Sequence, residues 1–228
     1  MKIQRATLAT CPTASGLVVV IDVLRAFTTA GYLFDAGVEE IFLVSQVKEA
    51  FALRNQLPDC IIAGEVDGVR VPGFDMGNSP STINAVVHPA KRVILRTTAG
   101  TQGVILAKEA GVILTTALTN VSATVRYIQN LAPESVTLIQ SGLFEDRGWG
   151  DEDVACADVI EDMILNKPIY WNSIYQRVRA SKAGTHYDGT RIDFPFADLQ
   201  MTLERDRFHF AMLVERKDGL FCTHPVNS

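Results

Sequence analysis

Short aliphatic runs alternate along the chain with segments whose apolar residues recur at helical spacing. The runs, rich in Val and Ile, predict strands over 17–21, 40–44, 61–64, 92–95, 112–115 and 136–139. The segments between them predict helices over 24–36, 47–56, 101–110, 122–130 and 153–165. Because the predicted strands are apolar almost throughout, helices are expected to cover both faces of the sheet. The alternation predicts an α/β fold with a largely parallel sheet.

Two later parts of the chain depart from this alternation. The segment 66–89 is rich in Gly, Pro, Asp, Asn and Ser and predicts a long ordered loop. Beyond residue 167, a polar helical stretch is expected over 169–182, and the tail predicts two strands joined at Asp218 and Gly219. We expect one folded unit over 1–228, with a division into two lobes near residue 89 left open.

Composition narrows the classes of partner. The chain has 228 residues, 47% of them hydrophobic, and a formal net charge of -5 without a basic run, which disfavours nucleic acid and anionic membrane surfaces. No apolar stretch is long enough to cross a bilayer and no secretory leader pattern is present, so we expect a cytoplasmic protein. Its four cysteines lack a Cys-x-x-Cys pair and its four histidines are scattered, so no zinc site is expected.

Polar residues gather at the corners where predicted strands end. Ligands of parallel α/β sheets bind at these carboxyl ends, so we expect the corner residues to surround one site. They are Asp22, Arg25, Thr28 and Thr29; Glu65; Arg96, Thr97, Thr98, Gly100 and Thr101; Asn120; Ser141 and Gly142; and Glu152 and Asp153.

Asp22 directly follows a strand of aliphatic residues, where an unpaired carboxylate is costly to bury. It therefore needs a cation, which could be a divalent metal, a substrate-linked proton or the guanidinium of Arg25. Arg25 and Arg96 are suited to bidentate contact with phosphate, although both could instead pair with local carboxylates.

Three further segments each have a chemical and a purely structural interpretation. "RTTAGTQG" could cradle phosphate with successive N–H groups or could be a well-capped helix start. Glu152 and Asp153 could bind a hard cation such as Mg²⁺ or simply favour the helix dipole. "GFDMGNSPS", with Asn78 and Ser79, could be a substrate loop or a rigid turn. The chain has no Walker, dinucleotide-binding or Gly-x-Ser-x-Gly motif.

Together these corners resemble the 2-phosphosulfolactate phosphatase family, magnesium-dependent acid phosphatases of coenzyme M biosynthesis. The resemblance rests on "VVVIDVLRAFTTA", "AGEVDG" followed by "GFDMGNSPS", "RTTAGTQG", "LTNVSA", "QSG" and "EDVACADVI", in the family's order over about residues 18–160. It implies a three-layer α/β/α fold with a parallel or mixed sheet, and hydrolysis of a small anionic phosphate monoester to sulfolactate and phosphate.

The roles of the matching positions come from chemical inference and not from the resemblance. Asp22, with Glu152 or Asp153, is expected to hold Mg²⁺, and Glu65 belongs to the catalytic set. Arg25, Arg96 and the N–H groups of 98–101 are expected to stabilise the phosphoryl group, with Asn78 and Ser79 contacting the organic part. A nucleophilic role for Asp22 ranks lower, because many aspartyl-phosphate enzymes have Asp-x-Asp where this chain has Leu24.

Four positions depart from the family pattern. Val66 stands where the family has Arg and Ala99 where it has Asn, and Gln140 and Ser141 replace Cys and Ala of a Cys-Ala-Gly turn. Losing the Arg and the Asn could remove anion contacts worth on the order of 1–3 kcal/mol each. The departures leave open a phosphatase for another metabolite or a non-catalytic anion-binding homologue. A homodimer is also left open.

Overall fold

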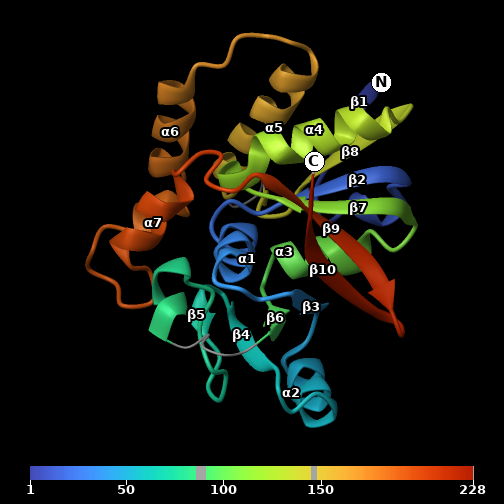
Figure 1. Cartoon of the computed structure of the whole chain (residues 1–228). Helices are drawn as coiled ribbons and strands as arrows, with labels where there is room; N and C mark the ends of the chain where they lie inside the picture. The colour runs from blue at the N-terminus through green and yellow to red at the C-terminus, as the bar shows by residue number, and fades with distance from the viewer. Residues whose placement is uncertain (86–90, 145–147, 228) are drawn as a thin grey trace.

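The computed structural model describes residues 1–85, 91–144 and 148–227, and their strands form one sheet. The order across this sheet is β1-β8-β2-β7-β9-β10-β3-β6-β4-β5 (Figure 1). The strands are β1 Lys2–Ala6, β2 Gly16–Ile21, β3 Glu40–Val44, β4 Ile61–Val66, β5 Val69–Arg70, β6 Arg92–Arg96, β7 Ala110–Thr116, β8 Ser135–Gln140, β9 Phe210–Lys217 and β10 Leu220–Asn227.

Helices cover both faces of this sheet, so the predicted three-layer α/β fold is confirmed. They are α1 Ala26–Asp35, α2 Val47–Gln56, α3 Gly100–Leu106, α4 Val121–Leu131, α5 Asp151–Ile164, α6 Trp171–Ala180 and α7 Phe196–Thr202. Each strand and helix predicted above is present, and β1, β5 and α7 are additional. The expected lobe boundary near residue 89 lies outside the described residues.

The sheet is mixed because a hairpin separates two parallel groups. β2 is parallel to β7 and β8, and β6 is parallel to β3 and β4. Between the two groups, β9 and β10 pair antiparallel with each other and with their outer neighbours β7 and β3. Asp218 and Gly219 have positive φ angles of 52° and 81°, as a tight hairpin turn requires.

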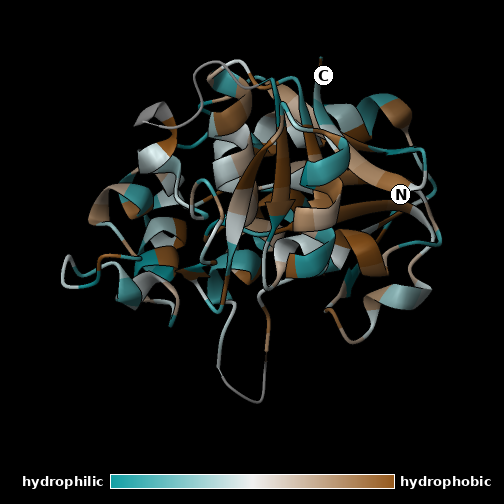
Figure 2. Ribbon diagram, turned by 90° about the horizontal axis from the view of Figure 1, so that it is seen from below, coloured by the Kyte–Doolittle hydropathy of each residue, from teal (hydrophilic) through white to brown (hydrophobic). Residues whose placement is uncertain are grey.

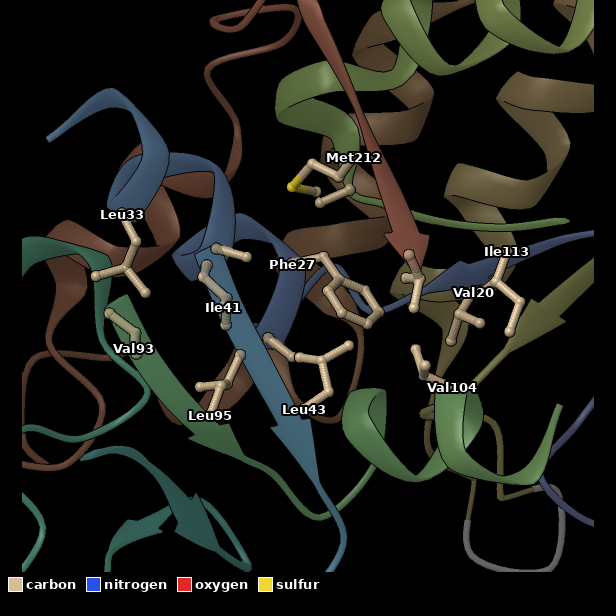
Figure 3. Packing of buried hydrophobic residues seen from close by; sticks show 14 of the residues in the cluster. Val20, Phe27, Leu33, Ile41, Leu43, Val93, Leu95, Val104, Ile113 and Met212 are labelled. Carbon is tan, nitrogen blue, oxygen red and sulfur yellow. The ribbon is translucent and has the colours of Figure 1, made fainter. Parts of the chain in front are cut away.

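One hydrophobic cluster joins α1 to both parallel groups. Phe27 and Leu33 of α1 are fully buried in it, together with Val20 of β2 and Ile41 of β3 (Figure 3). The strands are coloured mainly as hydrophobic, and many peripheral segments as hydrophilic (Figure 2). Anchoring α1 on both sides fixes its first turn, next to Asp22, relative to the ends of both groups of strands.

No helix among the described residues is both long and apolar enough to cross a membrane. Cys11, Cys60, Cys156 and Cys222 are all free and buried, which agrees with the absence of a disulfide framework in the sequence.

Candidate active site

A cavity of about 270 Å³ lies where the carboxyl ends of β2, β4, β6 and β8 meet the start of α5. Its wall brings together residues from five of the predicted corners and from the predicted substrate loop. The predicted site residues that line it are Asp22, Arg25, Glu65, Asn78, Thr98, Gly142 and Glu152.

Asp22 follows the last residue of β2 and is 5% exposed. Its Oδ1 accepts a hydrogen bond from the backbone N–H of Ala26, 2.9 Å away, at the start of α1. Burial raises the pKa of Asp22 to about 6, and the nearby carboxylate of Glu65 contributes to this increase. No described lysine or arginine forms an ion pair with Asp22. The Arg25 guanidinium, one of the expected partners, pairs instead with Asp198.

Gly100 allows the start of α3 to approach Asp22 closely. A Cβ atom at Gly100 would lie 2.7 Å from Asp22 Oδ2 and 2.7 Å from the Ala26 Cβ. Both distances are too short, so any larger residue must displace the β2–α1 corner.

The family resemblance implies phosphate hydrolysis, and for that activity we expect Gly100→Ala to lower the rate about 100-fold, because a shift of roughly 1 Å in a catalytic group has effects of this size. The loss of activity is measured as the initial rate of the folded variant relative to that of the wild type. Gly111→Ala is the matched control, since its Cβ would meet only Gly16 O at an ordinary 3.6 Å. Equal activity of the two variants would contradict the importance of this close contact.

The first turn of α5 supplies two buried carboxylates with different surroundings. Glu152 is 3% exposed and its Oε2 has no hydrogen-bond partner among the described residues. Burial raises its pKa to about 7, with Asp22 and Asp151 adding repulsion. Asp153 accepts the N–H groups of Val23 at 2.8 Å and Gly142 at 2.7 Å, one on each oxygen. Burial and the charges of Asp22 and Glu152 raise the pKa of Asp153 well above its ordinary value.

These carboxylates fit a magnesium ion with few protein ligands. The described residues contain no group of three His, Cys, Asp or Glu side chains arranged to hold a metal. Mg²⁺ commonly binds one or two carboxylates and keeps water or substrate phosphate as its other ligands. Asp22 and Glu152 both line the cavity and repel each other, so they supply the one or two carboxylates that this mode of binding needs. The positive charge of Arg25 offsets part of the cost of ionising Asp22. Asp153 does not line the cavity, and its oxygens hold the backbone of the β2 and β8 corners.

Glu65 connects the end of β4 to the β6 corner through hydrogen bonds to its carboxylate. Its Oε1 accepts the backbone N–H of Thr98 at 2.6 Å, and its Oε2 accepts the Thr98 hydroxyl at 2.9 Å. Gly68 N–H donates to the same Oε2 at 2.5 Å. Glu65 therefore holds Thr98 and the 67–68 turn in place at the cavity wall.

Arg96 lies at a corner but is not among the residues that line the cavity. Its Nε donates to Ser45 O at 3.1 Å and its Nη1 to Glu65 O at 2.6 Å. These bonds direct the guanidinium to backbone carbonyls of two other corners. The predicted contact of Arg96 with phosphate stays a prediction.

The other predicted residues lie behind the cavity wall. Most of their polar groups form hydrogen bonds inside the protein. Three hydroxyls are donors: Thr28 donates to Val23 O, Ser141 donates to Ile21 O, and Ser79 donates to Asp198. Thr97 and Thr101 bond to each other, and Asn120 accepts from the Thr116 hydroxyl and from Ala117 N–H. Thr29 differs, because its buried hydroxyl has no partner among the described residues. These side chains shape the corners, and their contact with a substrate is untested.

The remaining cavity wall comes from parts of the chain to which the sequence analysis gave no role. Trp149 precedes α5, and His186, Tyr187 and Phe194 lie between α6 and α7. The His186 ring is in edge contact with Trp149 and Phe194, with ring centroids 5.1 Å apart in each case. The sequence signal was present only as a change of composition around "HYDGTRIDFP". These four residues form an aromatic wall of the same cavity that Asp22 and Glu152 line.

Comparison with known proteins shows the family to which the chain belongs. The family model described as 2-phosphosulpholactate phosphatase matches residues 4–213. A protein of Bacillus subtilis named "Probable 2-phosphosulfolactate phosphatase" is 36% identical over 205 residues, covering 90% of this chain and 81% of that protein. Proteins of the same name from Deinococcus radiodurans and Carboxydothermus hydrogenoformans are each 37% identical.

The last two alignments cover 64% and 66% of this chain and only 60% and 61% of those relatives. The family model, in contrast, spans both the corners around Asp22 and Glu152 and the C-terminal aromatic wall. The chain belongs to the 2-phosphosulpholactate phosphatase family.

Proposed function

We propose that this protein hydrolyses a phosphate monoester of a small anionic acid, with Mg²⁺ as cofactor and 2-phosphosulfolactate as the first candidate substrate. The observation that carries the proposal is the pair of buried carboxylates, Asp22 and Glu152, which line one cavity and repel each other. A divalent cation bound by both would stabilise their ionised forms, and it would in turn attract phosphate. The names of the relatives support the choice of substrate.

In this proposal, each residue of the wall has a distinct task. Asp22 and Glu152 would hold the cation, which would supply positive charge to the phosphoryl oxygens and activate water. Arg25 adds positive charge on another side of the phosphoryl group. The amide of Asn78 orients the substrate, and Glu65 keeps Thr98 at the wall. Coenzyme M biosynthesis and a cytoplasmic location are part of the proposal on the family resemblance, and a homodimer stays a prediction.

Phosphate release by the purified protein tests the proposal. The panel contains 2-phosphosulfolactate, 2-phospholactate, which lacks the sulfonate, and phenyl phosphate, each assayed with Mg²⁺ and with chelator. We expect Mg²⁺-dependent release that is fastest from 2-phosphosulfolactate. Fastest release from phenyl phosphate would assign the aromatic wall to substrate recognition and replace the proposed substrate. Binding of the esters without release from any of them would contradict hydrolysis.

A further inference from the structure

Asp198, in the first turn of α7, is a fully buried carboxylate outside the set of residues predicted from the sequence. It does not itself line the cavity. One of its oxygens contacts Arg25, which lines the cavity, and the other contacts Ser79 and Ser81, which follow the cavity residue Asn78. This division of contacts suggests a role beyond holding α7 in place.

The first contact orients Arg25. Asp198 Oδ2 accepts from Arg25 Nη1 at 2.7 Å, and both side chains are buried, at 3% exposure or less. Nη1 also donates to Asp193 O at 2.9 Å, and Nη2 donates to Gly68 O at 3.1 Å. The guanidinium carbon lies 5.1 Å from the centroid of the Phe194 ring, close enough for a cation–π contact. The guanidinium is thus fixed in one orientation beside the cavity.

The second contact orients the loop that presents Asn78. Asp198 Oδ1 accepts from the hydroxyls of Ser79 at 2.9 Å and Ser81 at 2.6 Å, and from the backbone N–H of Ser81 at 3.0 Å. Asn78 immediately precedes these serines, lines the cavity and is 5% exposed. Its Oδ1 is buried and has no hydrogen-bond partner among the described residues.

We propose that Asp198 is a positioning residue, through which one buried carboxylate sets both the Arg25 guanidinium and the Asn78 amide for binding of the phosphate ester. The inference rests on the proposed function. Hydrogen bonds to a charged group have effects equivalent to roughly 10-fold to 100-fold in binding. Loss of the Asp198 charge should therefore weaken substrate binding strongly without touching Asp22 or Glu152.

Asp198→Asn is the primary test, because the amide preserves the shape of the side chain but places a donor against either Arg25 or the serines. We expect KM for the phosphate ester to rise at least about 10-fold, with a smaller change in kcat, since the cation-binding pair is intact. The dissociation constant for inorganic phosphate, measured by titration calorimetry with Mg²⁺ present, should rise by a similar factor.

Asp206→Asn is the matched control. Asp206 also accepts a backbone N–H and a hydroxyl, both from Ser122 at 2.8 Å, but it caps α4 and does not line the cavity. We expect this variant to keep the wild-type KM and phosphate affinity even where its melting temperature falls. If both variants changed KM equally, the effect of Asp198 would be general destabilisation and the proposal would be wrong.

A second variant covers the case in which Asp198→Asn does not fold. Ser79→Ala combined with Ser81→Ala removes the two hydroxyl contacts and leaves the Arg25–Asp198 ion pair intact. We expect it to raise KM and weaken phosphate binding in the same direction, because Asn78 is less well held. Unchanged KM and phosphate affinity in this double variant would overturn the proposal, whether or not Asp198→Asn folds.

Measurements of inorganic phosphate affinity distinguish a failure of this inference from a failure of the proposed function. A wild type that binds inorganic phosphate but releases none from any ester would contradict hydrolysis, while the affinity ratio between wild type and Asp198→Asn would still test positioning. A wild type that neither binds phosphate nor releases it would contradict both.

Discussion

Asp22→Asn is expected to reduce phosphate release by at least about 10³-fold, the size of effect typical for loss of a central electrostatic group. The asparagine Oδ1 can still accept the N–H of Ala26, so the corner between β2 and α1 should keep its shape. What is lost is the negative charge that attracts the cation. Initial rates at saturating Mg²⁺ and substrate measure the effect.

Asp35→Asn is a suitable control for this experiment. Asp35 is the last residue of the same helix, α1, and its half-exposed carboxylate pairs only loosely with Arg207, at 3.4 Å. An exposed pair of this kind contributes little to stability, so the variant should keep full activity. If the Asp22→Asn variant kept more than a tenth of wild-type activity, Asp22 would not be essential for the reaction.

Glu152→Gln is expected to change activity and stability in opposite directions. Phosphate release should fall by at least about 100-fold, because one of the two cation-binding carboxylates is lost. The metal-free protein should nevertheless melt at a higher temperature at pH 8. Glu152 Oε2 has no described hydrogen-bond donor, so replacing it with an amide breaks no bond there and removes a buried charge.

The pH dependence of this stability difference follows from the raised pKa of Glu152. In the unfolded chain the group titrates near its model value of 4.5, whereas in the folded protein its pKa is about 7. The folded state therefore binds the proton more tightly, and the stability this contributes is present below pH 4.5 and is lost as pH rises through 7. The loss is on the order of 3 kcal/mol.

Thermal melting of the metal-free proteins measures this difference. At pH 5, wild type and Glu152→Gln should melt within a degree or two of each other, whereas at pH 8 the variant should be higher by roughly 5–10 °C. Mg²⁺ should raise the melting temperature of the wild type at pH 8 and have less effect on the variant. If Glu152→Gln were less stable than wild type at pH 8, the free-energy cost assigned to burying the ionised Glu152 side chain would be contradicted.

The local pattern of the sequence was sufficient to predict the corners but not the contacts between distant segments. The aliphatic run before Asp22 indicated a buried strand end, and the predicted bounds of α2, residues 47–56, are those of the structure. In contrast, Asp198 and its partner Arg25 are 173 residues apart, and no local periodicity relates them. The strands of β9 and β10 were predicted, but their position between the two parallel groups depends on long-range pairing.

Arg25 and Arg96 illustrate the same limit at the candidate site. Both lie at a corner that follows a predicted strand, so the sequence analysis assigned both to anion binding. The structure distinguishes them by position, because Arg25 lines the cavity and Arg96 does not, although both donate to backbone carbonyls. β1 was missed for a different reason: only its last residue, Ala6, is buried, so it lacks the apolar run that marks the inner strands.

The most direct test of the account is a crystal structure of the protein grown with Mn²⁺ in place of Mg²⁺ and with inorganic phosphate. Anomalous scattering locates the Mn²⁺ independently of any activity. We expect one strong peak in the cavity beside Asp22 and Glu152, in contact with a phosphate oxygen, and no such peak in the Asp22→Asn variant. A Mn²⁺ peak elsewhere in a protein that releases phosphate, with these two carboxylates unoccupied, would contradict the account.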